Sequence, residues 1–279
     1  MLSYRHLFHA GSFADVFKHV LLTRLLLSLN EKGKPYFYLD THAGIGRYDL
    51  SHPWAQKGRE FESGIKKLWD RTDIPAAMKP YMDIVRAENA DGHLRYYPGS
   101  PRIARQLIRP IDRIALTELN KTDCAVLHEL FARDRRVNVQ LMDGYQSLKA
   151  NLPPKERRGM VLIDSAFDVS REFARLAAAL QEAHTRWATG TYAIWYPLMG
   201  AGVIRGFEKQ IEAAGIKKVL QFELSVLPED ASTMPGSGMI IVNPPWKFDT
   251  EMRTLLRWLW SALTVKSAGG VKVNWLVRE

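Results

Sequence analysis

A shortage of cysteine is the first constraint that this sequence imposes. Cys124 is the single cysteine among 279 residues, so no intramolecular disulfide framework can form. No apolar run approaches the ~20 residues that a membrane span needs. The start of the sequence, Met1-Leu-Ser-Tyr-Arg-His, is too polar for a signal peptide. We therefore expect a cytoplasmic protein with no membrane partner.

Short motifs of several enzyme classes are also missing. The sequence contains no Gly-x-Ser-x-Gly elbow, which argues against a serine hydrolase. His6, His9, His19 and His42 could offer imidazoles to zinc, but no cysteine pair or tight carboxylate cluster accompanies them. We therefore predict that the protein binds no metal.

What the sequence does contain is a series of short apolar runs that each end in an acidic residue. The runs end at Asp40, Glu118, Asp143 and Asp164. Runs of this length, separated by helical patterns, are typical of buried parallel strands in an α/β sheet. Ligands of such sheets bind outside the carboxyl ends of the strands. Four acidic residues at this edge predict a ligand with hydroxyl, amino or cationic groups rather than phosphates.

The pattern of alternating strands and helices predicts one doubly wound, Rossmann-like domain. Predicted strands cover 36–40, 114–118, 137–143, 160–164, 191–196, 218–226, 239–242 and 271–277. The first helix is expected to begin at Ser12, where Ser12-Phe-Ala-Asp15 is similar to a capping box. Residues 51–95 interrupt the alternation with two helical patterns, 61–69 and 76–89. We therefore assign residues 1–50 and 96–279 to the main domain and 51–95 to a small helical insertion.

The turn after the first predicted strand, Asp40-Thr-His-Ala-Gly44-Ile-Gly46, indicates the kind of ligand. It has two glycines where a dinucleotide fingerprint needs three, it has no phosphate-loop lysine, and Asp40 would repel phosphate. S-adenosylmethionine fits better, because it carries an ammonium, a sulfonium and a ribose diol but no phosphate. Asp40 and Asp164 could face its methionine end, Glu118 the ribose, and Asp143-Gly144 the adenine.

The charge balance favours a polyanionic partner. Lys and Arg together number 39 against 30 Asp and Glu, a formal net charge of +9. This excess suits RNA, DNA or an acidic membrane surface, and charge alone does not choose among them.

Longer motifs carry a resemblance to a known family. They run from one end of the chain to the other: Tyr4-Arg-His6-x-x-His9-Ala-Gly, Ala14-Asp-Val-x-Lys18-His19, Leu39-Asp-Thr-His-Ala-Gly44, Arg95-Tyr-Tyr-Pro-Gly-Ser100-Pro, Leu116-Thr-Glu118-Leu, Asp143-Gly144, Arg158-Gly159, Ala188-Thr-Gly-Thr-Tyr-Ala193 and Asn243-Pro-Pro-Trp-Lys247. With these motifs the chain resembles the RlmJ-type 23S ribosomal RNA adenine-N6 methyltransferases.

The resemblance implies a class I methyltransferase fold with a helical insertion. It also implies methyl transfer from S-adenosylmethionine to an adenine of 23S ribosomal RNA, and we expect a monomer. By motif position, it implies cofactor contacts by Lys18, His19, His42, Ser100, Glu118, Asp143 and Gly144, to which the turn adds Gly44 and Asp40. It places Tyr4, His6, Lys18 and Asp164 at the reaction centre.

One motif departs from the family pattern. Amino-methylating members carry Asp-Pro-Pro-Tyr or Asp-Pro-Pro-Phe after the fourth strand, whereas this chain has Asp164-Ser165-Ala166-Phe167. The motif supplies hydrogen-bond acceptors to the target amine, and its aromatic residue can stack on the extruded base. Ser165 and Ala166 keep the backbone carbonyls but lose the rigidity of proline. We expect Asp164 and Phe167 to stay usable, with weaker pre-organisation.

Three alternatives follow from these observations. Loss of both prolines could leave an RNA-binding protein that keeps the cofactor pocket but has weakened or lost catalysis. The same motif could also methylate DNA or a glutamine side chain. Finally, Asn243-Pro-Pro-Trp246 could replace the altered motif, but its strand comes late, where we expect the sheet edge, so we interpret it as a rigid turn that ends an antiparallel strand.

Overall fold

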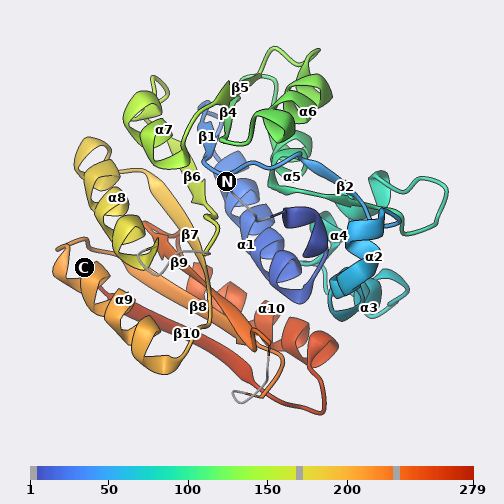
Figure 1. The fold of residues 1–279 in the computed structure, drawn as a ribbon. Helices are drawn as coiled ribbons and strands as arrows, with labels where there is room; N and C mark the ends of the chain where they lie inside the picture. Colours follow the sequence, from blue (N-terminus) through green and yellow to red (C-terminus); the bar gives the residue numbers. More distant parts are fainter. Residues whose placement is uncertain (1–4, 168–171, 229–232) are drawn as a thin grey trace.

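The structure, a computed structural model, describes residues 5–167, 172–228 and 233–279 and is built on a central sheet (Figure 1). Eight strands lie in the order β10-β8-β9-β7-β6-β1-β4-β5. Their bounds are β1 (Phe37–Asp40), β4 (Arg113–Glu118), β5 (Val137–Leu141), β6 (Gly159–Ile163), β7 (Thr191–Pro197), β8 (Val219–Ser225), β9 (Gly236–Val242) and β10 (Gly270–Val277). This arrangement confirms the predicted α/β fold, with strand bounds within a few residues of those expected.

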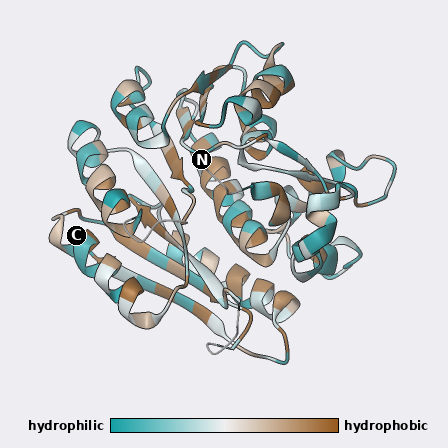
Figure 2. Cartoon of the chain, viewed as in Figure 1, coloured by the Kyte–Doolittle hydropathy of each residue, from teal (hydrophilic) through white to brown (hydrophobic). Residues whose placement is uncertain are grey.

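Helices cover both faces of the sheet. One face packs against α1 (Phe13–Asn30), α5 (Ser100–Leu107), α6 (Lys121–Phe131) and α10 (Phe248–Leu263). The other packs against α7 (Gly144–Asn151), α8 (Glu172–Arg186) and α9 (Ala201–Ala213). Hydrophobic residues follow the strands and the inner sides of the helices (Figure 2). Within the described ranges, no helix has the length and apolar character needed to cross a bilayer.

Strand β1 shows how the sequence pattern builds the two cores. Its four residues are fully buried, as expected for a strand covered on both faces. Alternation along the strand places Tyr38 in the core on the α1 side, and Phe37 and Leu39 in the core on the α8 side. The strand runs parallel to β4 and β6 on its two sides, so the carboxyl ends of all three meet at one edge.

Helix α1 begins where the sequence predicted. Ser12 is its N-cap, and the Ser12 hydroxyl accepts a hydrogen bond from the backbone N–H of Asp15. The helix is buried on most of its circumference, because it lies between the sheet, α5, α10 and the insertion. A short 3-10 helix, η1 (His6–Phe8), precedes it.

A pair of short strands, which were not predicted from the sequence, flanks the segment that interrupts the strand-helix alternation. Strands β2 (Arg47–Asp49) and β3 (Tyr96–Pro98) pair antiparallel, and three residues each are too few for a recognisable alternation. Between them lie α2 (Pro53–Gly58), η2 (Glu60–Ser63), α3 (Ile65–Trp69) and α4 (Lys79–Ala87). The buried side chains of α3 and α4 join the same core as α1. The division into domains stays a prediction.

The late Asn243-Pro-Pro-Trp246 motif lies far from the carboxyl edge of the parallel strands. Strand β9 runs antiparallel to β7, and Val242 pairs with Tyr192 at the beginning of β7. Asn243 Nδ2 donates to the carbonyls of Ala188 and Gly190. The turn interpretation is confirmed, but the expected position at the sheet edge is wrong: β9 lies between β7 and β8, and β10 forms that edge.

Candidate active site at the carboxyl edge of the sheet

A cavity of about 190 Å³ opens at the carboxyl ends of β1, β4, β5 and β6. The loop after each of these strands contributes to its lining, and α1 and α5 close it from one side. Nine of the ten residues expected to contact a cofactor lie on this lining: Lys18, His19, His42, Gly44, Ser100, Glu118, Asp143, Gly144 and Asp164. The fold therefore brings together residues that are widely separated in the sequence, although their roles stay predictions.

Asp40 is the exception, and the expectation that it faces the ligand is not supported. Its side chain is 0% exposed, does not line the cavity, and accepts hydrogen bonds from the Tyr38 hydroxyl at 2.9 Å and from His42 N at 3.4 Å. The alternation of the strand explains this, because Asp40 and Tyr38 point to the same face of the sheet. Burial raises the pKa of Asp40 to about 6, against the opposing effect of hydrogen bonds from Ser100 and Tyr38.

Glu118 links the glycine turn to the end of β4 by a hydrogen bond. Its two carboxylate oxygens accept hydrogen bonds from Gly44 N at 2.9 Å and Asn120 N at 2.7 Å. Gly44 has a φ of +60°, a left-handed conformation that suits glycine. Burial raises the pKa of Glu118, while the two backbone N–H groups act in the opposite direction. The carboxylate still has lone pairs that can accept from a ligand hydroxyl.

Asp143 and Gly144 form the beginning of α7. Asp143 is the N-cap, with one carboxylate oxygen accepting from Tyr145 N and Gln146 N, and the other 2.8 Å from Arg175 Nη2. A Cβ on Gly144 would lie 2.4 Å from the carbonyl oxygen of Thr41 and 2.6 Å from His42 Cε1. Only glycine lets α7 approach the turn after β1 this closely.

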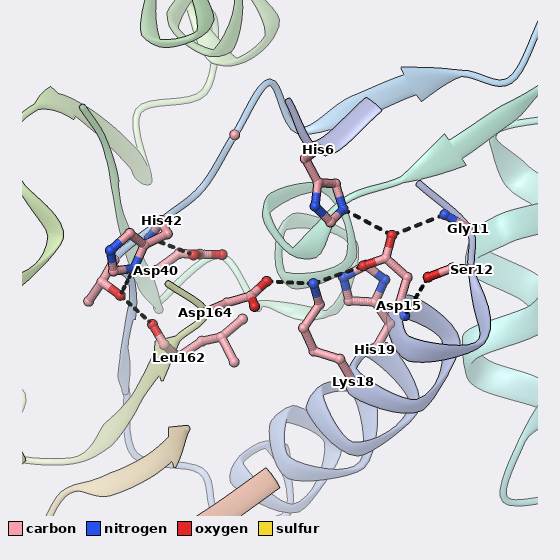
Figure 3. Close-up of polar contacts among 12 residues, drawn as sticks. His6, Gly11, Ser12, Asp15, Lys18, His19, Asp40, His42, Leu162 and Asp164 are labelled. Carbon is pink, nitrogen blue, oxygen red and sulfur yellow. Dashed lines mark hydrogen bonds and ion pairs between the residues drawn. The ribbon is translucent and has the colours of Figure 1, made fainter. Parts of the chain in front are cut away.

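A buried chain of charged groups crosses the site from α1 to the end of β6 (Figure 3). Lys18 Nζ lies 2.5 Å from Asp164 Oδ2 and 2.8 Å from Asp15 Oδ1. The other Asp15 oxygen accepts from Gly11 N and lies 3.0 Å from His6 Nε2. Burial acts to lower the pKa of Lys18, but the two carboxylates outweigh it and raise the pKa, so the ammonium stays protonated.

His19 lies beside this series of charged groups but is itself uncharged. Its ring is buried, and Nδ1 lies 2.8 Å from the Tyr97 hydroxyl. Burial, reinforced by the charge of Lys18, holds the pKa of His19 well below its usual range. The imidazole is therefore neutral at physiological pH and can bind a ligand only through a hydrogen bond or van der Waals contact.

A second, larger cavity of about 970 Å³ adjoins the first. Both are lined by His6, Lys18, Asp164, Ser165 and Ala166, so the Lys18–Asp164 pair lies where the two cavities meet. The larger cavity is also lined by residues of the C-terminal half of the sheet and, from the insertion, by Gly58, Arg59, Glu60, Glu62 and Ser63. A ligand in one cavity would therefore meet a ligand in the other beside this ion pair.

Phe167 lines the larger cavity and not the smaller one. Its ring packs against Phe173, with centroids 4.8 Å apart, and edge-on against Trp195 at 5.8 Å. Trp195, which sequence reasoning did not select, lines the same cavity. Tyr4, expected at the reaction centre, lies outside the described residues.

Sequence reasoning also missed Asp15. It treated Ser12-Phe-Ala-Asp15 as a capping signal alone, although Asp15 lies one helical turn before Lys18 and can pair with it. Burial acts to raise the pKa of Asp15, yet the nearby charges of His6 and Lys18 hold it well below its usual range. Within the described ranges, no group of three or more His, Cys, Asp or Glu residues could hold a metal ion.

Comparisons with known proteins find relatives of this chain over its full length. Two proteins named ribosomal RNA large subunit methyltransferase J match over 100% of both chains: one from Escherichia coli (strain K12) at 46% identity and one from Haemophilus influenzae at 44%. A crystallised Legionella pneumophila protein is 35% identical, with a TM-score of 0.87 over 95% of this chain and 97% of that one.

A more distant structure shares the fold alone. A probable spermidine synthase from Corynebacterium glutamicum is 11% identical and has a TM-score of 0.52, with 96% of this chain and 76% of that chain covered. The family model described as RsmJ, "Ribosomal RNA large subunit methyltransferase D, RlmJ", matches residues 33–277. Its extent and the full-length relatives show that this chain belongs to the RlmJ family of large-subunit ribosomal RNA methyltransferases.

Proposed function

We propose that this protein transfers a methyl group from S-adenosylmethionine to the N6 amine of an adenine in large-subunit ribosomal RNA. Membership of the family supports the reaction and the class of substrate. The observation that carries the proposal is the position of Asp164, at the junction of a small polar cavity and a larger cavity with aromatic residues. The smaller cavity would hold the methyl donor, and the larger one the base.

The residues of the smaller cavity fit S-adenosylmethionine. Glu118 and Asp143 offer carboxylate acceptors for hydroxyl and amino groups, and Lys18 offers one ammonium for a carboxylate. The close approach at Gly144 leaves the backbone, rather than a side chain, to face the ligand. When bound, the donor supplies an electrophilic methyl group on a sulfonium.

Asp164 would activate the target amine. The lone pair of an adenine amine is delocalised into the ring, so acceptors aimed at its N–H groups favour the pyramidal, nucleophilic form. Lys18 contacts Oδ2 of Asp164, and we assign Oδ1 and the carbonyl of Ser165 as the acceptors for the amine. Lys18 would hold the carboxylate in one orientation, which is the condition for productive alignment.

The larger cavity would receive the base itself. The N6 amine is paired inside a regular helix, so the adenine must be single-stranded or flipped out. Phe167 could stack on its ring, with Trp195 supporting Phe167 from the side. Stacking on an aromatic side chain contributes about 1–3 kcal/mol per base.

Methyl transfer from labelled donor to unmodified large-subunit rRNA fragments tests this function. We expect the label in N6-methyladenosine after digestion to nucleosides. The Asp164→Ala variant should lose transfer while its affinity for S-adenosylhomocysteine, measured by calorimetry, stays largely intact. Near-normal turnover by that variant would rule out the role assigned to Asp164.

The same assay separates the alternatives. Competition by DNA or by a glutamine-containing protein would identify another methyl acceptor. Binding of RNA and donor without transfer would favour the non-catalytic alternative that the Ser165-Ala166 sequence raises. The intact Lys18–Asp164 pair supports a catalytic protein over this alternative, because a site without chemistry has no need to keep a buried ammonium paired with a partly buried carboxylate.

A further inference from the structure

The carboxylate of Asp15 makes contacts that its position in a helix does not require. The N-cap of α1 is the Ser12 hydroxyl, which accepts from the backbone N–H of Asp15, so the cap does not use the Asp15 side chain. That side chain is 3% exposed and instead contacts Gly11 N, His6 Nε2 and Lys18 Nζ at 3.0, 3.0 and 2.8 Å. These contacts link the N-terminal segment to the reaction centre.

The geometry around Lys18 explains why a second carboxylate matters. A lysine has four rotatable side-chain bonds, and one ion pair does not fix its ammonium. With Asp15 Oδ1 at 2.8 Å and Asp164 Oδ2 at 2.5 Å, the ammonium lies between two acceptors and its position is determined by both (Figure 3). Without Asp15, a buried ammonium would have one partner and could follow any movement of Asp164.

Asp15 also holds the segment on the other side of the site. His6 belongs to η1 and lines both cavities, and it contacts the same Asp15 oxygen that accepts from Gly11 N. One buried carboxylate therefore fixes the N-terminal segment, Lys18 and, through Lys18, the acceptor at the junction of the cavities.

We propose that Asp15 is a positioning residue for methyl transfer, which orients Asp164 through Lys18 and holds His6 at the junction of the two cavities. This inference rests on the proposed function. Asp15 borders the larger cavity, but both of its carboxylate oxygens are engaged by His6, Gly11 N and Lys18, so in this role it acts by determining where Lys18, Asp164 and His6 lie. It should therefore affect the rate of the chemical step more than the binding of the donor.

The test compares Asp15→Asn with a matched buried aspartate, Asp112→Asn. Asp112 is 2% exposed and accepts from Tyr36 N at 3.0 Å and Arg109 Nε at 2.9 Å, immediately before β4 and so at the opposite edge of the sheet. Both substitutions remove one buried charge and keep the shape. Thermal melting, calorimetry with S-adenosylhomocysteine and single-turnover methylation of an rRNA fragment are measured for each.

We expect Asp15→Asn to bind the donor product within about threefold of the wild type and to lose roughly 10- to 100-fold in single-turnover rate. Asp112→Asn should keep its rate, whatever its melting temperature. A folded, donor-binding Asp15→Asn variant with the wild-type rate would overturn the inference. Asp15→Glu, which restores the charge at a longer reach, should recover part of the rate.

A double-mutant cycle distinguishes positioning through Lys18 from a general loss of structure. In a Lys18→Gln background, Asp15→Asn should cost less than it does in the wild-type background, because the part of its effect that passes through the lysine is already lost and only the contact with His6 remains to be removed. An undiminished additional loss would contradict the inference. If the wild type itself transferred no methyl to rRNA adenine, the proposed function would be wrong. If the wild type were active and the Asp15→Asn variant equally active, only the inference about Asp15 would be wrong.

Discussion

Lys18 Nζ and Asp164 Oδ2 lie 2.5 Å apart, although the two residues are separated by 146 positions in the sequence. The pair joins the helix that begins the fold to the end of β6, and it lies on the wall shared by both cavities. Packing of α1 against the sheet is therefore a condition for assembling the proposed reaction centre.

The close approach of α7 to the turn after β1 makes Gly144 intolerant of a side chain. In Gly144→Ala, the Cβ would meet Thr41 O and the His42 ring, so the turn must shift. We expect affinity for S-adenosylhomocysteine to weaken by roughly tenfold or more, equivalent to about 1.4 kcal/mol, in calorimetry. Gly33→Ala is the control, because nothing lies within 4 Å of a Cβ at that position. Equal affinities in the two variants would contradict this account of the cavity.

Asp40 should make stability fall as the pH rises. Its pKa is about 6 in the folded protein against an ordinary value of 3.8, so the folded state holds a proton that the unfolded state releases between about pH 4 and 6. Stability is lost across this window, by about 3 kcal/mol at most, and the loss is complete above it.

The Asp40→Asn variant isolates this effect. Asparagine keeps an acceptor for the Tyr38 hydroxyl but cannot ionise. Denaturant unfolding from pH 4 to pH 8 should show the variant gaining on the wild type as the pH rises. Parallel stability curves for the two proteins would show that Asp40 does not have a raised pKa.

Restoring proline to the altered motif should increase the rate of methyl transfer. In the described part of the chain, no hydrogen bond is donated by the backbone N–H of Ser165 or Ala166, so proline removes no hydrogen bond there. The fixed φ of proline should narrow the range of conformations of the loop that carries Asp164. We expect the Ser165→Pro, Ala166→Pro double variant to turn over faster in single-turnover assays at unchanged donor affinity. A slower double variant would indicate that the loop needs its present freedom.

Binding of RNA should weaken steeply with salt. The net charge of +9 favours phosphate contacts, and each phosphate neutralised on a single strand contributes about −0.7 to the slope of log affinity against log salt. Titrations of an rRNA fragment at several salt concentrations give this slope. Donor-product affinity under the same conditions is the control and should change little. A slope near zero would argue against phosphate contacts as the main source of affinity.

The sequence predicted which residues line the smaller cavity better than it predicted what those residues contact. Glu118, Asp143 and Asp164 could be placed because parallel strands align their ends, and this rule needs no knowledge of side-chain direction. Asp40 also lies at the end of a parallel strand, but its side chain points to the buried face of the sheet, beside Tyr38. The decisive fact there is the alternation within β1, which a run of wholly buried residues conceals.

Long-range pairing could not be predicted in the same way. Asp15 had a sufficient local explanation at the start of a helix, and nothing in the sequence indicated that its carboxylate would instead share Lys18 with Asp164. Likewise, the short strands β2 and β3 carry no alternation of their own and form only because the two ends of the insertion meet.

That meeting point has a consequence for how the family can diversify. Gly99 N donates a hydrogen bond to Gly46 O at 2.9 Å. The chain therefore leaves the glycine turn after β1 and returns beside it, next to Ser100. The exposed loops between these two glycines can therefore change in length while Gly44 and Ser100 keep their places at the cavity, whereas α3 and α4 are tied to the core that they share with α1. Under the proposed function, selection for a new RNA target could act on these loops without disturbing the residues that we propose to bind the methyl donor.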